Sequence, residues 1–128
     1  MKIQLKFDDR AMTATLVDSE AALAFVAMLP LTITMHDLFG REKFGALPRP
    51  VGQAEVRSRA CRPGDLICWS AGPDLAVLHA QDDMPLCGGF HVLGHLDEGA
   101  EAFAAPGPLL LTIELPPMDP GRRFTALR

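Results

Sequence analysis

The sequence predicts a mainly β protein, a closed or nearly closed antiparallel β-barrel of about eight strands with two short helices. Three observations lead to this prediction. Apolar and polar residues alternate with period 2 in several stretches, residues 64–79 form an apolar hairpin, and the helical stretches are too few and too far apart for a βαβ pattern. A closed sheet also leaves no exposed strand edge.

The hairpin is the stretch around which the rest of the chain is organised. Residues 64–79 read GDLICWSAGPDLAVLH, and adjacent residues are apolar on both sides of the turn at 71–74. Strands that are covered on both faces have this composition. Trp69, the only tryptophan, is expected in the core or in the wall of a pocket, and Cys68 is expected to be a small core residue.

The first third of the chain alternates strands with one helix. Period-2 alternation predicts strands at residues 2–7, 11–17 and 31–38. A ten-residue helix begins after Asp18 or Ser19, which are both good N-cap residues, and Pro30 ends it.

The remaining elements are separated by long, turn-rich connections. Residues 41–63 read as a long connection with one short strand near residues 43–47, and residues 81–89 read as a second excursion. The further elements expected are a strand at 90–96, a short helix at 98–105 capped by Asp97, and a strand at 108–115. We therefore divide the chain into a barrel domain, residues 1–115, and a tail, residues 116–128.

Composition limits the classes of function. A chain of 128 residues with 48% apolar and 22% charged residues is typical of one globular domain, and no apolar run is long enough to span a bilayer. The basic residues are scattered and the net charge is −4, so we expect neither a nucleic-acid nor a membrane partner, although the basic stretch 41–62 leaves a local positive patch open. Three cysteines without a signal peptide indicate free thiols and a cytoplasmic location.

The order of these pieces resembles that of the small bacterial and archaeal proteins with a cyclophilin-like fold. The resemblance covers residues 2 to about 115, and it rests on the order and spacing of four motifs: Leu29-Pro30-Leu31, Leu47-Pro48-Arg49, Gly64-Asp65 with its hairpin, and Leu93-Gly94 followed by Pro106-Gly107-Pro108. It implies a cyclophilin-type barrel with a helix near each open end, but it identifies no activity, because the function of these small proteins is uncharacterised.

The resemblance does not extend to prolyl isomerisation. True cyclophilins carry segments resembling FHR and FxMQGGD around the proline pocket, and neither is present here. Only the last two letters of the second segment occur, as Gly64-Asp65, and Arg62-Pro63 precede them in place of Gln-Gly. We therefore assign no catalytic residue and leave enzymatic activity uncertain, with a non-enzymatic function favoured.

No motif for covalent hydrolysis, nucleotide binding or a zinc ribbon is found in the sequence. Cys87, His91 and His95 are spaced by four, but on a strand the two histidines would lie about 13 Å apart on one face, so we predict no metal and no cofactor. A ligand site needs apolar walls and a few polar anchors. The residues expected to converge on such a site are Lys43, Arg49, Trp69, His79 and Phe90.

Two functions follow as hypotheses. The first is a binding module for a small molecule or an extended peptide, without isomerase activity. The second is a divergent prolyl isomerase in which Arg49 polarises the amide. A third, structural hypothesis concerns the tail. A frayed tail is the default, and the alternative is a homodimer in which Phe124 and Leu127 dock on a partner subunit.

Overall fold

The computed structural model describes residues 1–117 with the exception of residues 53–55, 61, 71 and 81–84. The helices and strands in these residues are β1 (Lys2–Phe7), β2 (Arg10–Leu16), α1 (Glu20–Val26), β3 (Leu31–Leu38), β4 (Glu42–Ala46), β5 (Val56–Arg59), β6 (Asp65–Trp69), β7 (Asp74–Leu78), β8 (Leu86–Leu96), the 3-10 helix η1 (Ala100–Ala104) and β9 (Leu109–Glu114). The tail is outside this description from residue 118 onward, so the division at residue 115 remains a prediction.

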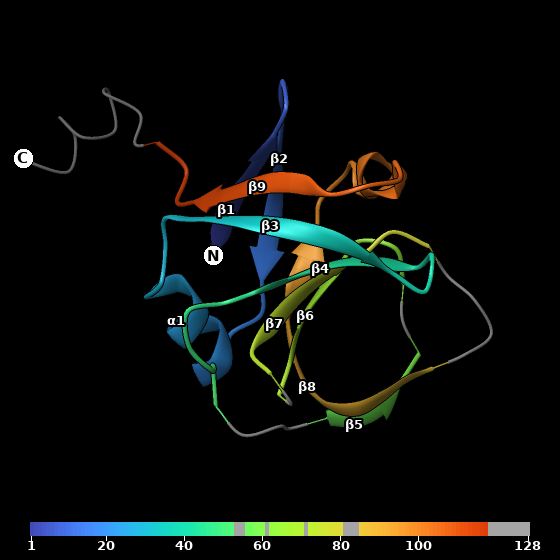
Figure 1. The fold of residues 1–128 in the computed structure, drawn as a ribbon. Helices are drawn as coiled ribbons and strands as arrows, with labels where there is room; N and C mark the ends of the chain where they lie inside the picture. Colours follow the sequence, from blue (N-terminus) through green and yellow to red (C-terminus); the bar gives the residue numbers. More distant parts are fainter. Residues whose placement is uncertain (53–55, 61, 71, 81–84, 118–128) are drawn as a thin grey trace, which may run out of the picture.

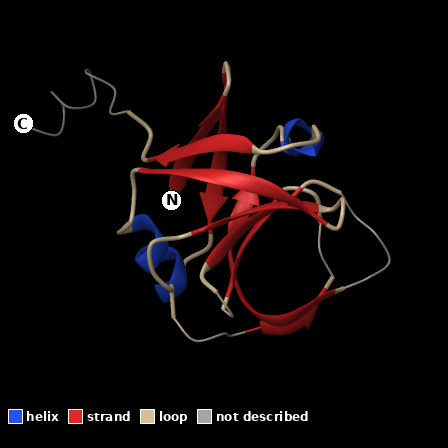
Figure 2. Cartoon of the chain, in the orientation of Figure 1, coloured by secondary structure: helices blue, strands red, loops and turns tan. Residues whose placement is uncertain are grey.

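The strands form one antiparallel barrel, as the sequence predicts. Their order is β2-β1-β9-β3-β4-β7-β6-β8-β5, and β2 also pairs with β8. Eight strands therefore close on themselves, and β5 attaches to the far end of β8 (Figure 1). The two helical segments lie at opposite sides of the barrel (Figure 2). No helix in the described residues has the length and apolarity needed to cross a membrane.

The closing seam between β2 and β8 is short and rests on a glycine. Thr15 pairs with His95 and Leu16 pairs with Gly94. A Cβ atom on Gly94 would lie 2.3 Å from the Thr15 carbonyl oxygen, so the two backbones approach this closely only because the residue has no side chain.

The central hairpin is covered on both faces, which confirms its sequence prediction. Leu66 and Cys68 face the main core, whereas Ile67 between them belongs to a second apolar cluster on the opposite face of the sheet. Each of the three side chains is only 1% exposed. This second cluster consists of Ile67, Ala76, Leu78 and Phe90, with Phe44, Trp69 and Val92 packed against it.

Two helix predictions need adjustment. Ser19 caps α1 through its Oγ, which accepts from Ala22 N at 3.1 Å, but the helix ends at Val26, one turn before Pro30. The second helix is a single 3-10 segment, and Asp97 does not cap it. The Asp97 carboxylate instead accepts hydrogen bonds from three side chains of the β1-β2 hairpin: Lys2, Thr13 and Thr15.

Two strand predictions were incomplete. The sequence did not predict β5 within the connection 41–63, and the predicted strand at 90–96 begins at Phe90, whereas β8 begins at Leu86. Gly88-Gly89 suggested a turn, and Gly88 does adopt a positive φ of 115°. The strand continues through this glycine because its first part pairs with β5 and its later part pairs with β6.

Candidate functional site

The five residues predicted to converge lie in separate places. Trp69 and Phe90 meet in the second apolar cluster, with ring centroids 5.3 Å apart in an edge-to-face arrangement. Arg49 is exposed on the connection after β4 and makes no described hydrogen bond or ion pair. Whether any of these residues binds a ligand remains a prediction.

Lys43 faces away from Trp69, into the main barrel. Its side chain is fully buried, and Nζ donates to Asp37 Oδ1 at 2.5 Å, to the Ala105 carbonyl at 2.7 Å and to the Gly107 carbonyl at 2.6 Å. An ammonium group has three hydrogens, so these bonds use all of its donors. The bond from Lys43, followed by one from the Gly107 amide, lowers the pKa of Asp37. Lys43 therefore ties the segment 105–107 to β3 and has no donor left for a ligand.

His79 follows β7 on the same side as Val77, which places it near Lys43. Both ring nitrogens are buried and have no hydrogen-bond partner in the described residues. Burial lowers the pKa of His79, and the positive charge of Lys43 lowers it further. The lowered pKa favours the neutral form of the imidazole, which sits on the opposite face of the sheet from Trp69.

The sequence reading missed Glu42, a fully buried carboxyl group in the second apolar cluster. Its Oε1 accepts a hydrogen bond from Trp69 Nε1 at 3.1 Å, and Arg41 Nε lies 3.6 Å from Oε2. Burial raises the pKa of Glu42, partly offset by the bond from Trp69. The alternation of Glu42 with Phe44 was the available signal, because residues two apart on a strand share a face. Arg41 and Lys43 are themselves buried, so the possible positive patch at 41–62 is smaller than the sequence suggested.

A histidine and a buried aspartate form the most site-like arrangement on the outer side of the barrel. His95 Nδ1 lies 2.9 Å from Asp65 Oδ1, and the Asp65 side chain is only 4% exposed whereas that of His95 is 39% exposed. Asp65 Oδ2 accepts from the Arg62 amide at 2.9 Å. A carboxylate accepts hydrogen bonds, so Nδ1 carries the hydrogen in this pair, and Nε2 is the ring nitrogen that Asp65 does not engage.

This pair lies in a groove of about 280 Å³, which we call the His95 groove. Leu16, Val17 and Val92 supply apolar surface, and Arg62 supplies a cation. Its lining residues are Thr15, Leu16, Val17, Arg62, Asp65, Val92, Gly94 and His95. A groove with apolar walls and a few fixed polar groups has the general composition of a small-molecule site.

Two glycines make room for the imidazole. Gly64 has a φ of 100°, and a Cβ atom there would lie 2.9 Å from His95 Cε1, so the ring packs against the bare backbone of Gly64. Gly94 allows β8 to approach β2 next to the histidine. The motifs Gly64-Asp65 and Leu93-Gly94 were noticed in the sequence as fold markers, and here they also build the groove.

The expectation that His91 and His95 share one strand face is wrong. The pairing of β6 with β8 shifts register between Leu66, which pairs with Gly94, and Ile67, which pairs with Val92. As a result Cys68 pairs with His91 and Asp65 pairs with His95. Cys68 faces the main core, so His91 is buried and only 3% exposed, while His95 points to the outside. Among the described residues, no group of three or more His, Cys, Asp or Glu side chains is arranged to hold a metal ion.

Comparisons with known proteins agree with this fold. The structure is similar to the solution structure of a hypothetical protein from Archaeoglobus fulgidus, with a TM-score of 0.69 and 15% sequence identity over 91% of this chain and 95% of the other. At this identity the likeness concerns the fold alone. The comparison with curated proteins gives no match. The model of the cyclophilin-like family matches residues 5–114, which is most of the chain and includes Asp65 and His95. The chain therefore belongs to the cyclophilin-like family.

Proposed function

We propose that this protein is a binding module that holds a small molecule in the His95 groove, and that it works in the cytoplasm without prolyl isomerase activity. The observation that carries the proposal is the fixed imidazole of His95. A buried carboxylate orients the ring through Nδ1, so Nε2 points in a set direction before any ligand arrives. Such preorganisation lowers the cost of binding.

The groove favours a ligand with both an apolar part and a hydrogen-bonding group. Leu16, Val17 and Val92 offer contact to the apolar part. Nε2 accepts a hydrogen from a hydroxyl or amide group when the imidazole is neutral, and it donates to an anionic group when the imidazole is protonated. The ligand class is therefore a small hydroxyl, amide or carboxylic acid compound, or the corresponding group of an extended peptide.

The test is a ligand screen read by NMR on the two exposed histidines. The probes are small carboxylic acids, primary amides and short peptides, and the signals are the ring protons of His95 and His36. His36 is an exposed strand residue outside the groove and serves as the internal control. We expect saturable shifts at His95 and at the methyl groups of Val17 and Val92, which His95→Gln abolishes and His36→Gln does not. Shifts that map elsewhere, or that survive His95→Gln, would refute the assignment.

Prolyl isomerisation is the alternative, and two observations keep it open. The chain belongs to the cyclophilin-like family, and the exposed guanidinium of Arg49 is accessible to a peptide. We place it second because Arg49 lines none of the described pockets. The expected result of an isomerase assay on a short proline peptide is no acceleration. Acceleration that Arg49→Ala removes would establish the alternative.

A further inference from the structure

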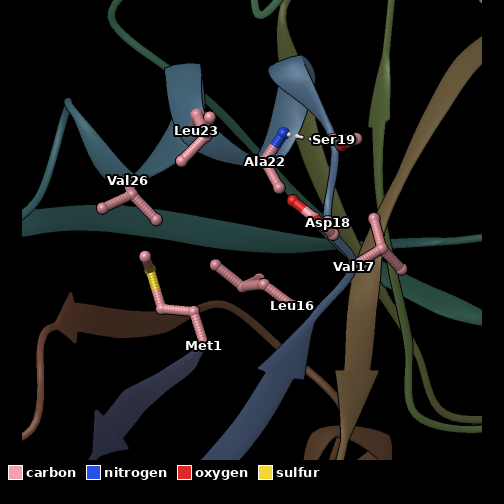
Figure 3. Close-up of a pocket in the computed structure, with 8 residues that line it drawn as sticks. All are labelled: Met1, Leu16, Val17, Asp18, Ser19, Ala22, Leu23 and Val26. Atoms are coloured by element: carbon pink, nitrogen blue, oxygen red, sulfur yellow. Dashed lines mark hydrogen bonds between the residues drawn. The ribbon is translucent and has the colours of Figure 1, made fainter.

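A second pocket, beside α1, has a different chemistry from the His95 groove. It has a volume of about 270 Å³, and its walls converge from three places: the start of the chain, the end of β2 and one side of α1 (Figure 3). We call it the α1 pocket. Its lining residues are Met1, Leu16, Val17, Asp18, Ser19, Ala22, Leu23 and Val26, so six of the eight are apolar.

The α1 pocket leaves large apolar side chains in water. Met1 is 62% exposed, Val17 is 42% exposed and Leu23 is 57% exposed. Only three other large apolar residues in the described part of the chain are exposed to this degree: Phe39, Leu110 and Leu115. Exposed apolar surface gathered around one concavity, with carboxylates at its edge, is typical of a docking site.

The last strand before the C-terminal segment ends on the side of the barrel where Met1 lines this pocket. Glu114, the last residue of β9, pairs with Gln4 of β1, so β9 ends three residues along β1 from Met1. Met1 is itself held at the pocket by its carbonyl, which accepts from Leu16 N at 2.8 Å. Phe124 follows Pro117 by seven residues. Seven extended residues span about 24 Å, whereas the three residues of β1 that separate Gln4 from Met1 at the pocket span about 10 Å.

The chemistry of the segment complements that of the pocket. Residues 118–128 read MDPGRRFTALR, with Phe124 and Leu127 as large apolar groups and with three arginines, Arg122, Arg123 and Arg128. Asp18 at the pocket and Glu20 beside it are exposed, and neither makes an ion pair with a described residue. The segment also lies beyond residues 5–114, so it is not part of the matched family domain.

We propose that the C-terminal segment folds back and buries Phe124 and Leu127 in the α1 pocket of its own chain, with its arginines facing Asp18 and Glu20. The short connection favours the same chain over a second copy, because a tethered segment has an effective concentration in the millimolar range. Leu16 and Val17 line both the α1 pocket and the His95 groove, so the docked segment borders the proposed ligand site.

The experiment measures NOEs in the full-length protein between the Phe124 ring and the methyl groups of Val17, Leu23 and Val26. We expect such NOEs, and we expect Phe124→Ser to reduce the ratio of docked to free segment at least tenfold, since a buried phenylalanine contributes at least that factor. Leu23→Ser should release the segment as well. Leu110→Ser is the matched control, because Leu110 is equally exposed but lies outside the pocket, and it should leave the NOEs unchanged.

A mixed sample of isotope-labelled and unlabelled chains separates the possible arrangements. NOEs within one chain support the proposal. NOEs that appear only between labelled and unlabelled chains would overturn it in favour of a homodimer formed through the tail. An absence of NOEs at the α1 pocket, or identical methyl shifts in the wild type and Phe124→Ser, would also overturn it. None of these results depends on a ligand in the His95 groove.

Discussion

The substitution Gly94→Ala tests the closing seam of the barrel. A Cβ atom at this position would lie 2.3 Å from the Thr15 carbonyl oxygen and 2.9 Å from Leu16 Cα. Both contacts are with backbone, so no side-chain rotation relieves them. To bring the first contact to 3.0 Å, the strands β2 and β8 must separate by about 0.7 Å.

The size of the effect follows from this separation. Beside the seam, Val17 N donates to the Leu93 carbonyl at 2.9 Å, and an extra 0.7 Å would lengthen that bond to about 3.6 Å, beyond hydrogen-bond range. One lost bond costs about 1 kcal/mol, and overpacking strain adds about 1–3 kcal/mol. We therefore expect Gly94→Ala to lower the free energy of unfolding by about 2–4 kcal/mol and the melting temperature by roughly 10 °C.

The assay is urea unfolding followed by tryptophan fluorescence, with Gly72→Ala as the matched control. Gly72 has an ordinary φ, and its Cβ would meet only Asp74 Oδ2 at 3.9 Å, so that variant should stay within about 0.5 kcal/mol of the wild type. If Gly94→Ala were as stable as Gly72→Ala, the close approach at the seam, and with it the position of His95 in the groove, would be refuted.

Three further predictions concern stability and reactivity. Lys43→Met should lower the free energy of unfolding in urea by about 2–3 kcal/mol, because two carbonyl groups and a carboxylate lose a buried charged donor. The control Lys6→Met, whose side chain is 45% exposed, should lower it by less than about 1 kcal/mol. Equal losses in the two variants would contradict the prediction. Hydrogen bonds from Lys2 and then from Thr13 and Thr15 lower the pKa of Asp97 to about 2, so the stability that this carboxylate contributes is complete above its unfolded pKa and is lost as the pH falls toward 2. Asp97→Asn should flatten the decline in melting temperature over that range, and an unchanged slope would refute the assignment. Burial raises the pKa of the Cys68 thiol to about 11. Mass spectrometry after thiol labelling at pH 8 should therefore find Cys68 unmodified in the folded protein and modified in urea. Labelling of Cys68 at equal rates in the two conditions would contradict its burial.

Much of the barrel is predictable from local pattern. Period-2 alternation located β1, β2, β3 and the two strands of the central hairpin to within a residue or so, because a half-buried strand must alternate whatever its neighbours are. The pattern failed in β8, where Gly88-Gly89 looks like a turn but the strand continues across it, because β5 pairs with its first part and β6, on the other side, pairs with its later part.

The candidate site was less predictable. Asp65 and His95 are 30 residues apart, and nothing in their local sequences indicates that β6 and β8 are neighbours. The same is true of Lys43 and Gly107, which meet only because β9 returns beside β3. The sequence placed Lys43 in a short strand near residues 43–47 and among the ligand-site candidates, and it gave no role to Glu42. Both side chains are fully buried because β4 is an interior strand of the barrel.

The class of fold and the central hairpin are predictable from the sequence because they depend on the spacing of apolar residues along the chain, and the family is predictable because its motifs keep their order and spacing. The tertiary structure alone decided which strands pair, where the barrel closes and which polar groups meet. Alternation says which residues share a face but not which strand lies opposite, and one register shift in β8 reverses the face. For that reason His95 became visible as the partner of Asp65 only when the pairing of β8 with β6 was known.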